Sequence, residues 1–198
     1  MTQAFNIKTN QKEIVKQLGR KYKKHMPEAT QDAINATAFK LRKTYIAQAR
    51  QKFDNPTSFT LNAFVVKKAT LKKLSAKVFI QDKQNQAKYL APQIEGGSQP
   101  RHKGSYVVPV EGTPLNEQGN LKFRKNLTGA GRHVRKTKTG WGLYSKGTKK
   151  KPSQLLAVFK KIINYDAIFP FYKIGFGLVE RTFPKKMKQK LKYYMKKK

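Results

Sequence analysis

The clearest pattern in the chain is a stripe of apolar residues that recurs every three or four positions from Ile34 to Phe53. This spacing places the apolar side chains on one side of an α-helix and leaves basic and polar residues on the other. Pro27 suits the first position of such a helix, because the missing N–H would have no helical partner there. The pattern predicts a helix over 27–53, preceded by a shorter one near 10–24.

The period changes after this helix. Apolar and polar residues alternate, and β-branched and aromatic residues are frequent, which predicts strands near 59–68 and 75–82 joined as a hairpin. A further strand is expected at 155–159, continued by Ile162-Ile163.

Apolar positions also predict a C-terminal helix and a short segment that packs on the core. Apolar residues from Ile174 to Tyr194 return to helical spacing and predict a C-terminal helix, which Pro184 should kink or divide. The segment 89–95 is expected to be a short apolar turn that packs on the core and ends at Gly96-Gly97.

Residues 98–152 have a different character. Glycine and proline are frequent, apolar residues come in short bursts, and no acidic residue occurs between Gln118 and Tyr165. Such a segment buries too little apolar area to offset its ordering entropy, so we expect a long basic arm with little structure of its own.

Together these elements predict an α+β fold. A long N-terminal amphipathic helix packs on a small antiparallel sheet, and a long basic arm and a C-terminal helix follow. The chain of 198 residues has the size of one domain or two small ones. We expect one domain: a helix-plus-hairpin part at 1–97, the arm at 98–152, and a strand and helix at 153–198 that complete the same core.

Charge adds the strongest indication of function. The chain has 44 Lys and Arg against 10 Asp and Glu, a formal net charge of +34. An acidic partner would relieve this repulsion, and nucleic acid is the first candidate because phosphate neutralisation releases counterions. No motif for reading bases is present, so the expected contact is independent of sequence. The residues expected to face DNA are Arg101, Lys103, Lys122, Arg124, Lys125, Arg132, Arg135, Lys136, Lys138, Lys149, Lys150 and Lys151. The lysine-rich tail from Lys185 to Lys198 is expected to contact DNA as well.

Two apolar bursts inside the basic arm are candidate subunit-interface anchors. The residues are Tyr106, Val108 and Val110 in the first burst, and Trp141 and Tyr144 in the second. Stacking of the second pair on bases is the alternative.

The sequence offers little for catalysis. It contains no cysteine, its acidic residues are scattered, and no metal-ligand spacing or phosphate-binding glycine loop occurs, so we expect no enzyme, cofactor or metal. A metal-free ribonuclease that pairs Glu95 with His102, or Glu111 with His133, stays open as an alternative. No signal peptide and no apolar run of membrane-spanning length are found, so no membrane partner is expected.

Several phrases of the sequence are familiar as a group. They are Ala33-Ile-Asn-Ala36, Asn55-Pro-Thr-Ser-Phe-Thr-Leu-Asn62, Val66-Lys-Lys-Ala-Thr70, Ala76-Lys-Val-Phe79, Tyr89-Leu-Ala-Pro-Gln-Ile-Glu-Gly-Gly97 and Leu115-Asn-Glu-Gln-Gly-Asn120. With the long helix they resemble the minor tail or tail-completion proteins of long-tailed bacteriophages, including the minor tail protein Z family. The resemblance covers roughly 28–120 and, more loosely, 153–192.

The resemblance implies a structural protein of the virion neck or tail, made in the host cytoplasm, that acts in tail completion and head–tail connection. It implies a homo-oligomeric ring, expected to be a hexamer, around the genome path. The connector, the tail terminator or the tail tube would be its neighbours, and the basic arm departs from a compact family core. A non-specific nucleic-acid-binding protein, ribosomal or nucleoid-like, is the alternative, because its composition would be much the same.

Overall fold

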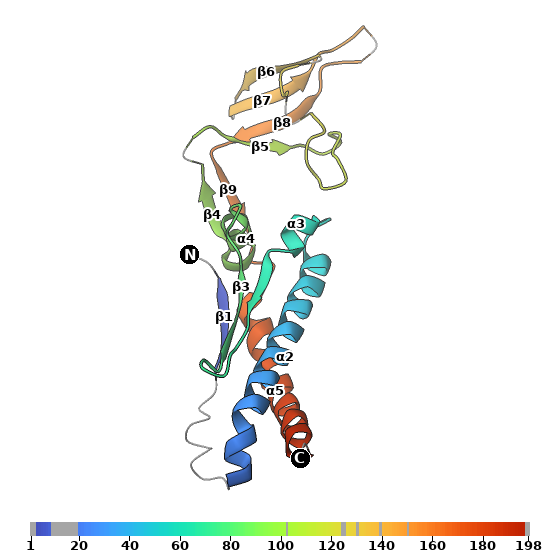
Figure 1. Cartoon of the computed structure of the whole chain (residues 1–198). Coiled ribbons are helices and arrows are strands. Elements are labelled where there is room, and N and C mark those ends of the chain that lie inside the picture. The colour runs from blue at the N-terminus through green and yellow to red at the C-terminus, as the bar shows by residue number, and fades with distance from the viewer. Residues whose placement is uncertain are drawn as a thin grey trace. The chain divides into compact units, whose positions relative to one another are not determined.

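The computed structural model describes residues 3–8, 20–101, 103–123, 126–129, 131–138, 140–149 and 151–196 (Figure 1). The chain divides into two compact units, where the sequence predicts one domain. Met1–Ile94 and Ile168–Lys198 form the first, here called the helical unit, and Glu95–Ala167 form the second, the sheet unit. Both contain antiparallel sheets, and the chain ends in a helix, so the α+β class is confirmed.

The helical unit consists of two long helices that lie side by side and a three-stranded antiparallel sheet with the order β1-β3-β2. Two shorter helices complete it. The elements are β1 (Ala4–Lys8), α2 (Arg20–Lys52), α3 (Ser58–Leu61), β2 (Phe64–Lys67), β3 (Ser75–Ile80), α4 (Gln86–Glu95) and α5 (Phe171–Lys196).

Helix α2 carries the apolar stripe that the sequence predicts, and Ile34, Leu41 and Tyr45 are fully buried. The expected start at residue 27 is wrong, because the helix begins at Arg20 and Pro27 lies inside it. Proline in a helix removes one backbone hydrogen bond, but burial of Met26 and Ala29 on either side of it favours a continuous helix. Residues 10–19 of the expected shorter helix lie outside the described residues.

The expected strand at 59–68 is correct only in its second half. Its first residues form α3. Thr57 is the N-cap of this helix, since its Oγ1 accepts a hydrogen bond from the Thr60 N–H at 3.3 Å. Such a cap favours a helical turn over an extended strand. The hairpin itself is confirmed, since β2 pairs antiparallel with β3.

Two further differences concern short segments. The sequence analysis missed β1, although Phe5 and Ile7 are buried and alternate with polar residues as in a half-buried strand. The expected turn at 89–95 belongs to helix α4, which buries Leu90 as predicted and ends before Gly96 and Gly97 turn the chain with φ of 69° and 93°.

The C-terminal helix is confirmed as α5. Its backbone stays helical from Phe171 to Lys196, so Pro184 does not begin a second helix. One face of α5 packs along α2 through Leu178 and Thr182, which are both buried.

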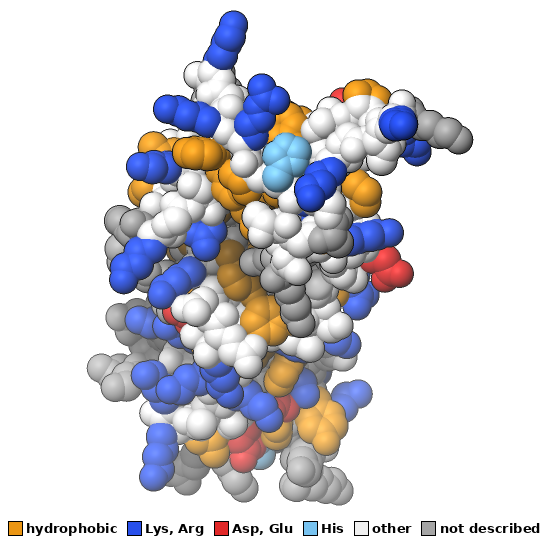
Figure 2. Space-filling view, turned by 90° about the horizontal axis from the view of Figure 1, so that it is seen from above, with side chains coloured by type: hydrophobic (Ala, Val, Ile, Leu, Met, Phe, Trp, Pro, Cys, Tyr) orange, Lys and Arg blue, Asp and Glu red, His pale blue; other side chains and the backbone are white. Residues whose placement is uncertain are grey.

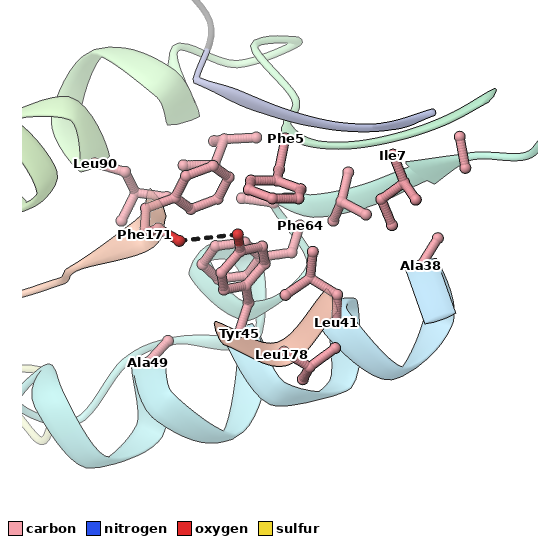
Figure 3. Close-up of a cluster of buried hydrophobic side chains, with 14 of the residues drawn as sticks. Phe5, Ile7, Ala38, Leu41, Tyr45, Ala49, Phe64, Leu90, Phe171 and Leu178 are labelled. Carbon is pink, nitrogen blue, oxygen red and sulfur yellow. Dashed lines mark hydrogen bonds between the residues drawn. The ribbon is translucent and has the colours of Figure 1, made fainter. Parts of the chain in front are cut away.

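An aromatic cluster forms the centre of the helical unit (Figure 3). Tyr45 of α2 stacks on Phe171 at the start of α5 with ring centroids 4.4 Å apart, and Phe64 and Phe169 lie next to this pair. The Tyr45 hydroxyl donates a hydrogen bond to the Phe171 carbonyl oxygen at 3.0 Å. Burial raises the pKa of Tyr45 above its ordinary value of 10.0.

We expect Tyr45→Phe to lower the free energy of unfolding by about 0.5–1.5 kcal/mol, because the buried hydrogen bond to the Phe171 carbonyl is lost. The raised pKa of Tyr45 adds a pH effect. Its phenol ionises more readily in the unfolded chain, so this contribution is present below pH 10.0 and is lost as the pH rises above that value. Urea unfolding followed by circular dichroism should show a difference between the two proteins that shrinks at alkaline pH. A constant difference would contradict the role of burial.

Helix α5 has a glycine at position 175 because strand β1 and helix α2 approach it too closely for a larger residue. A Cβ atom at this position would lie 2.6 Å from Phe5 Cδ2 of β1 and 2.8 Å from the Tyr45 hydroxyl of α2. Gly177, two residues further on, has open space, with Arg181 Nη2 at 3.8 Å as the nearest atom.

These two glycines provide a matched pair of variants. Gly175→Ala should destabilise the helical unit by about 1–3 kcal/mol through overpacking. Gly177→Ala should stabilise it by about 0.5–1 kcal/mol, because alanine favours the helix. Thermal unfolding followed by circular dichroism measures both, and equal effects of the two substitutions would contradict the close packing at Gly175.

The sheet unit contains a four-stranded antiparallel sheet with the order β5-β8-β7-β6 and a two-stranded sheet formed by β4 and β9. Their bounds are β4 (Gly97–Pro100), β5 (Tyr106–Pro109), β6 (Arg132–Thr137), β7 (Gly140–Ser145), β8 (Leu155–Lys160) and β9 (Ile162–Tyr165). Leu121, Leu143 and Ala157 form a small buried core of its own.

The expectation of an arm without structure at 98–152 is therefore wrong. Its apolar bursts are short strands, and β8, which follows the segment in sequence, inserts between β5 and β7 and supplies their pairing. The strand expected at 155–159 is confirmed. The expected continuation through Ile162-Ile163 instead forms β9, which pairs with β4 in the other sheet.

Candidate nucleic-acid interface

The strand register divides the four-stranded sheet into two faces. Val134, Leu143 and Ala157 lie opposite one another across β6, β7 and β8, so they share one face. The loop that carries Leu121 and Phe123 packs on this side, which we call the covered face. The other side is called the open face.

The open face carries a group of half-buried aromatic and aliphatic side chains. His133 pairs with Tyr144, which pairs with Leu155, and Val108 pairs with Val158. The rings of His133 and Tyr144 stack with centroids 5.9 Å apart.

Gly142 explains how the Tyr144 side chain lies on the open face. A Cβ on Gly142 would be 2.9 Å from Tyr144 Cε2 and 2.8 Å from Leu155 Cδ1. The two side chains therefore lie over the glycine and cover the strand at this point.

The structure places three of the five predicted interface anchors on one face of the sheet, although Tyr106 lies opposite Lys160 and Tyr144 opposite Leu155, five residues apart along β8. Tyr106, Val108 and Tyr144 occupy the open face. Trp141 pairs with Lys136 and Phe159 on the opposite face, and its side chain is 54% exposed. Val110 follows β5, and its N–H donates to the Leu156 carbonyl at 3.1 Å.

The predicted DNA-facing residues do not form one surface. Arg135 lies on the open face, whereas its neighbours Arg132 and Lys136 have the register of the covered face. Arg124, Lys125 and Lys150 lie outside the described residues. Those with exposed side chains are Arg101, Lys103, Lys122, Arg135, Lys136, Lys138, Lys149 and Lys151.

Two of the predicted DNA contacts are engaged within the chain. The Arg132 guanidinium lies 4.2 Å from the centroid of the Phe123 ring and donates hydrogen bonds to the carbonyls of Asn126 and Leu127 at 2.9 and 3.1 Å. Arg101 donates to the carbonyls of Lys103 and Ser105 at 3.1 and 3.0 Å. Both side chains hold loops in place.

We expect Arg132→Ala to destabilise the sheet unit by about 1–3 kcal/mol, since two carbonyls lose a charged donor. Arg135→Ala is the control and should stay within about 0.5 kcal/mol, because the Arg135 side chain is exposed. The single tryptophan, Trp141, lies in β7, so its fluorescence reports unfolding of the sheet unit. Equal stability of the two variants would contradict the assigned role of Arg132.

Cationic side chains dominate the surface beyond these residues. On the face shown in Figure 2, Lys and Arg side chains are spread widely and acidic ones are few. Across the part of the chain that the structure describes, the only ion pair of a lysine or arginine with an acid joins Lys190 to Asp32, and His25 Nδ1 lies 3.6 Å from a carboxylate oxygen of Glu28.

A basic groove in the helical unit escaped the sequence analysis. It lies between α2 and α5, has a volume of about 580 Å³, and is lined by Lys40, Arg181, Lys185 and Lys186 among others. Lys40 and Lys185 are far apart in the sequence, and only the pairing of the two helices brings them together. The lysine-rich tail that begins at Lys185 indicates one side of this groove, but nothing in the sequence indicates that Lys40 lies opposite it.

The candidate catalytic pairs gain no support from their surroundings. His102 lies outside the described residues, and no hydrogen bond or ion pair joins the described residues Glu111 and His133. The described residues contain no cluster of three His, Asp or Glu side chains that could hold a metal ion. None of the described helices is long and apolar enough to cross a membrane.

Comparison with known proteins found no match: no family model fits the chain, and neither a curated protein nor a solved structure is significantly similar to it. A function can therefore be proposed only from the charge and surfaces of the chain and from the resemblance noted in its sequence.

Proposed function

We propose that the protein is a structural component of the neck or tail of a long-tailed bacteriophage, where it contacts double-stranded DNA without reading its sequence. In this role it assembles as a homo-oligomeric ring around the genome path and takes part in tail completion and head–tail joining. Its neighbours are the connector and the tail terminator or tail tube.

One observation carries the DNA-binding part of the proposal. The chain has 34 more basic than acidic residues, and among the described residues only Lys190 pairs with an acid, Asp32. The other described lysines and arginines have no ion pair with a described acidic residue. Phosphate groups of a nucleic acid are the polyanion that such a surface fits best.

The assembly part rests on the sequence resemblance and on the open face of the sheet unit. Tyr106, Val108 and Tyr144 present half-buried apolar area on this face. Aromatic side chains of this kind are enriched at protein interfaces because they bury a large area and keep a polar end.

The alternative is a nucleic-acid-binding protein of ribosomal or nucleoid type. The same unpaired cations favour it, but it requires no ring and no virion. Assembly therefore distinguishes the two functions, and DNA binding alone does not.

We expect purified virions to contain this chain at a fixed low copy number, measured by quantitative mass spectrometry. The free protein should bind a duplex of arbitrary sequence with log K falling steeply as log [salt] rises, by about 0.9 for each phosphate contacted. Equal affinity for unrelated duplexes is the control for sequence independence.

Absence from particles together with steep DNA or RNA binding would favour the alternative. RNA cleavage by the purified protein that His133→Ala abolishes would overturn both proposals in favour of a nuclease.

A further inference from the structure

We propose that the α2–α5 groove is a binding site for the backbone phosphates of duplex DNA. The inference rests on the proposed DNA contact and deepens it. It assigns a specific contact to the helical unit, where the sequence analysis expects DNA contact only from the lysine tail as a whole and names no single residue.

The groove has room for a bound anionic group. Its volume of about 580 Å³ lies within the range of roughly 300–1,000 Å³ that is usual for ligand sites. Thr44 of α2 and Gln189 of α5 add polar groups to the lining, and Leu178 is part of its wall.

The charge of the groove is of one sign. Lys40 projects from α2, and Arg181, Lys185 and Lys186 project from α5, while no acidic residue is among the described lining residues. Arg181 and Lys185 stand four positions apart on α5, where like charges weaken a helix by a few tenths of a kcal/mol. Helix stability therefore does not explain this arrangement.

Hydrogen bonds within the chain occupy only some of the donor groups of the groove cations. Arg181 Nε donates to the Gly177 carbonyl at 2.7 Å, and Lys186 Nζ donates to Gln189 Oε1 at 3.2 Å. Among the described residues, Lys40 and Lys185 make no hydrogen bond, ion pair or ring contact. Their ammonium groups are available to an external anion.

A contrast on the same helix supports this interpretation. One turn beyond the groove, Lys190 Nζ lies 2.8 Å from Asp32 of α2, and the Tyr194 hydroxyl donates to the same carboxylate at 3.2 Å. This hydrogen bond to Asp32 raises the pKa of Lys190. At this point an acidic residue, Asp32, connects α2 to α5 through an ion pair. The described lining of the groove contains no acidic residue.

Phosphate is the anion that this set of donors fits. Lysine ammonium groups bind phosphate as point charges, and the free nitrogen atoms of Arg181 can donate to two phosphate oxygens. Successive phosphates of a backbone would engage both helices at once. An acidic protein segment is the competing occupant.

The test compares two double variants of the full chain with equal charge. Lys40→Gln with Lys185→Gln removes two groove cations. Lys72→Gln with Lys83→Gln removes two exposed loop lysines of the same unit and serves as the control. Fluorescence anisotropy with a labelled duplex gives the affinity at several salt concentrations, and thermal unfolding checks that both variants fold.

We expect the groove variant to lose about 1.8 from the salt slope and roughly 50-fold in affinity at 0.1 M salt, which corresponds to two phosphate contacts. The control variant should stay close to the wild type. If both double variants bind equally well while the wild type binds DNA, the groove assignment is wrong and the proposed function stands. If the wild type itself does not bind duplex DNA, the proposed function fails first.

A second arm separates phosphate from carboxylate ligands. Polyglutamate replaces the duplex as the labelled probe under the same conditions. Weaker binding of polyglutamate to the groove variant, with unchanged binding of DNA, would overturn the proposal in favour of an acidic protein segment.

Discussion

Repulsion between cations is the constraint under which this fold is built. With a formal net charge of +34, every folded conformation concentrates positive charge, and burial of apolar side chains must outweigh that cost. The helical unit does so with an aromatic centre around Tyr45 and with a close contact at Gly175 that lets β1, α2 and α5 approach one another. The few acidic residues therefore contribute strongly to local stability. The Asp32 carboxylate accepts hydrogen bonds from two side chains of α5, Lys190 and Tyr194.

The sheet unit meets the same constraint with less apolar material. Its buried core is small, and arginines contribute to holding it together, as Arg132 does over Phe123. A basic side chain in this chain is thus not automatically a ligand contact. A cation that already makes hydrogen bonds or ring contacts within the fold is less available to bind a phosphate. By this criterion, Lys40 and Lys185 of the α2–α5 groove are better candidates than Arg101 and Arg132.

Patterns that depend on neighbours in sequence were predictable from the chain. The buried stripe of α2, the β2–β3 hairpin and the C-terminal helix each follow from local periodicity. Features set by distant partners were not. Pro27 is tolerated inside α2 because Met26 and Ala29 are buried, and 98–152 forms strands because β8 arrives later in the chain to pair with them. The groove that joins Lys40 to Lys185 is of the same kind, since it exists only after two distant helices have packed.

The order of the segments has a consequence for synthesis on the ribosome. The helical unit is discontinuous: α2 is synthesised before the sheet unit, but α5, which completes the core of the helical unit, is synthesised after it. The sheet unit is a continuous insertion whose first and last strands, β4 and β9, pair with each other. The sheet unit can therefore fold while α5 is still in the exit tunnel. The apolar face of α2 stays unpacked until α5 has emerged. During that interval the exposed apolar face of α2 is a surface to which a chaperone can bind.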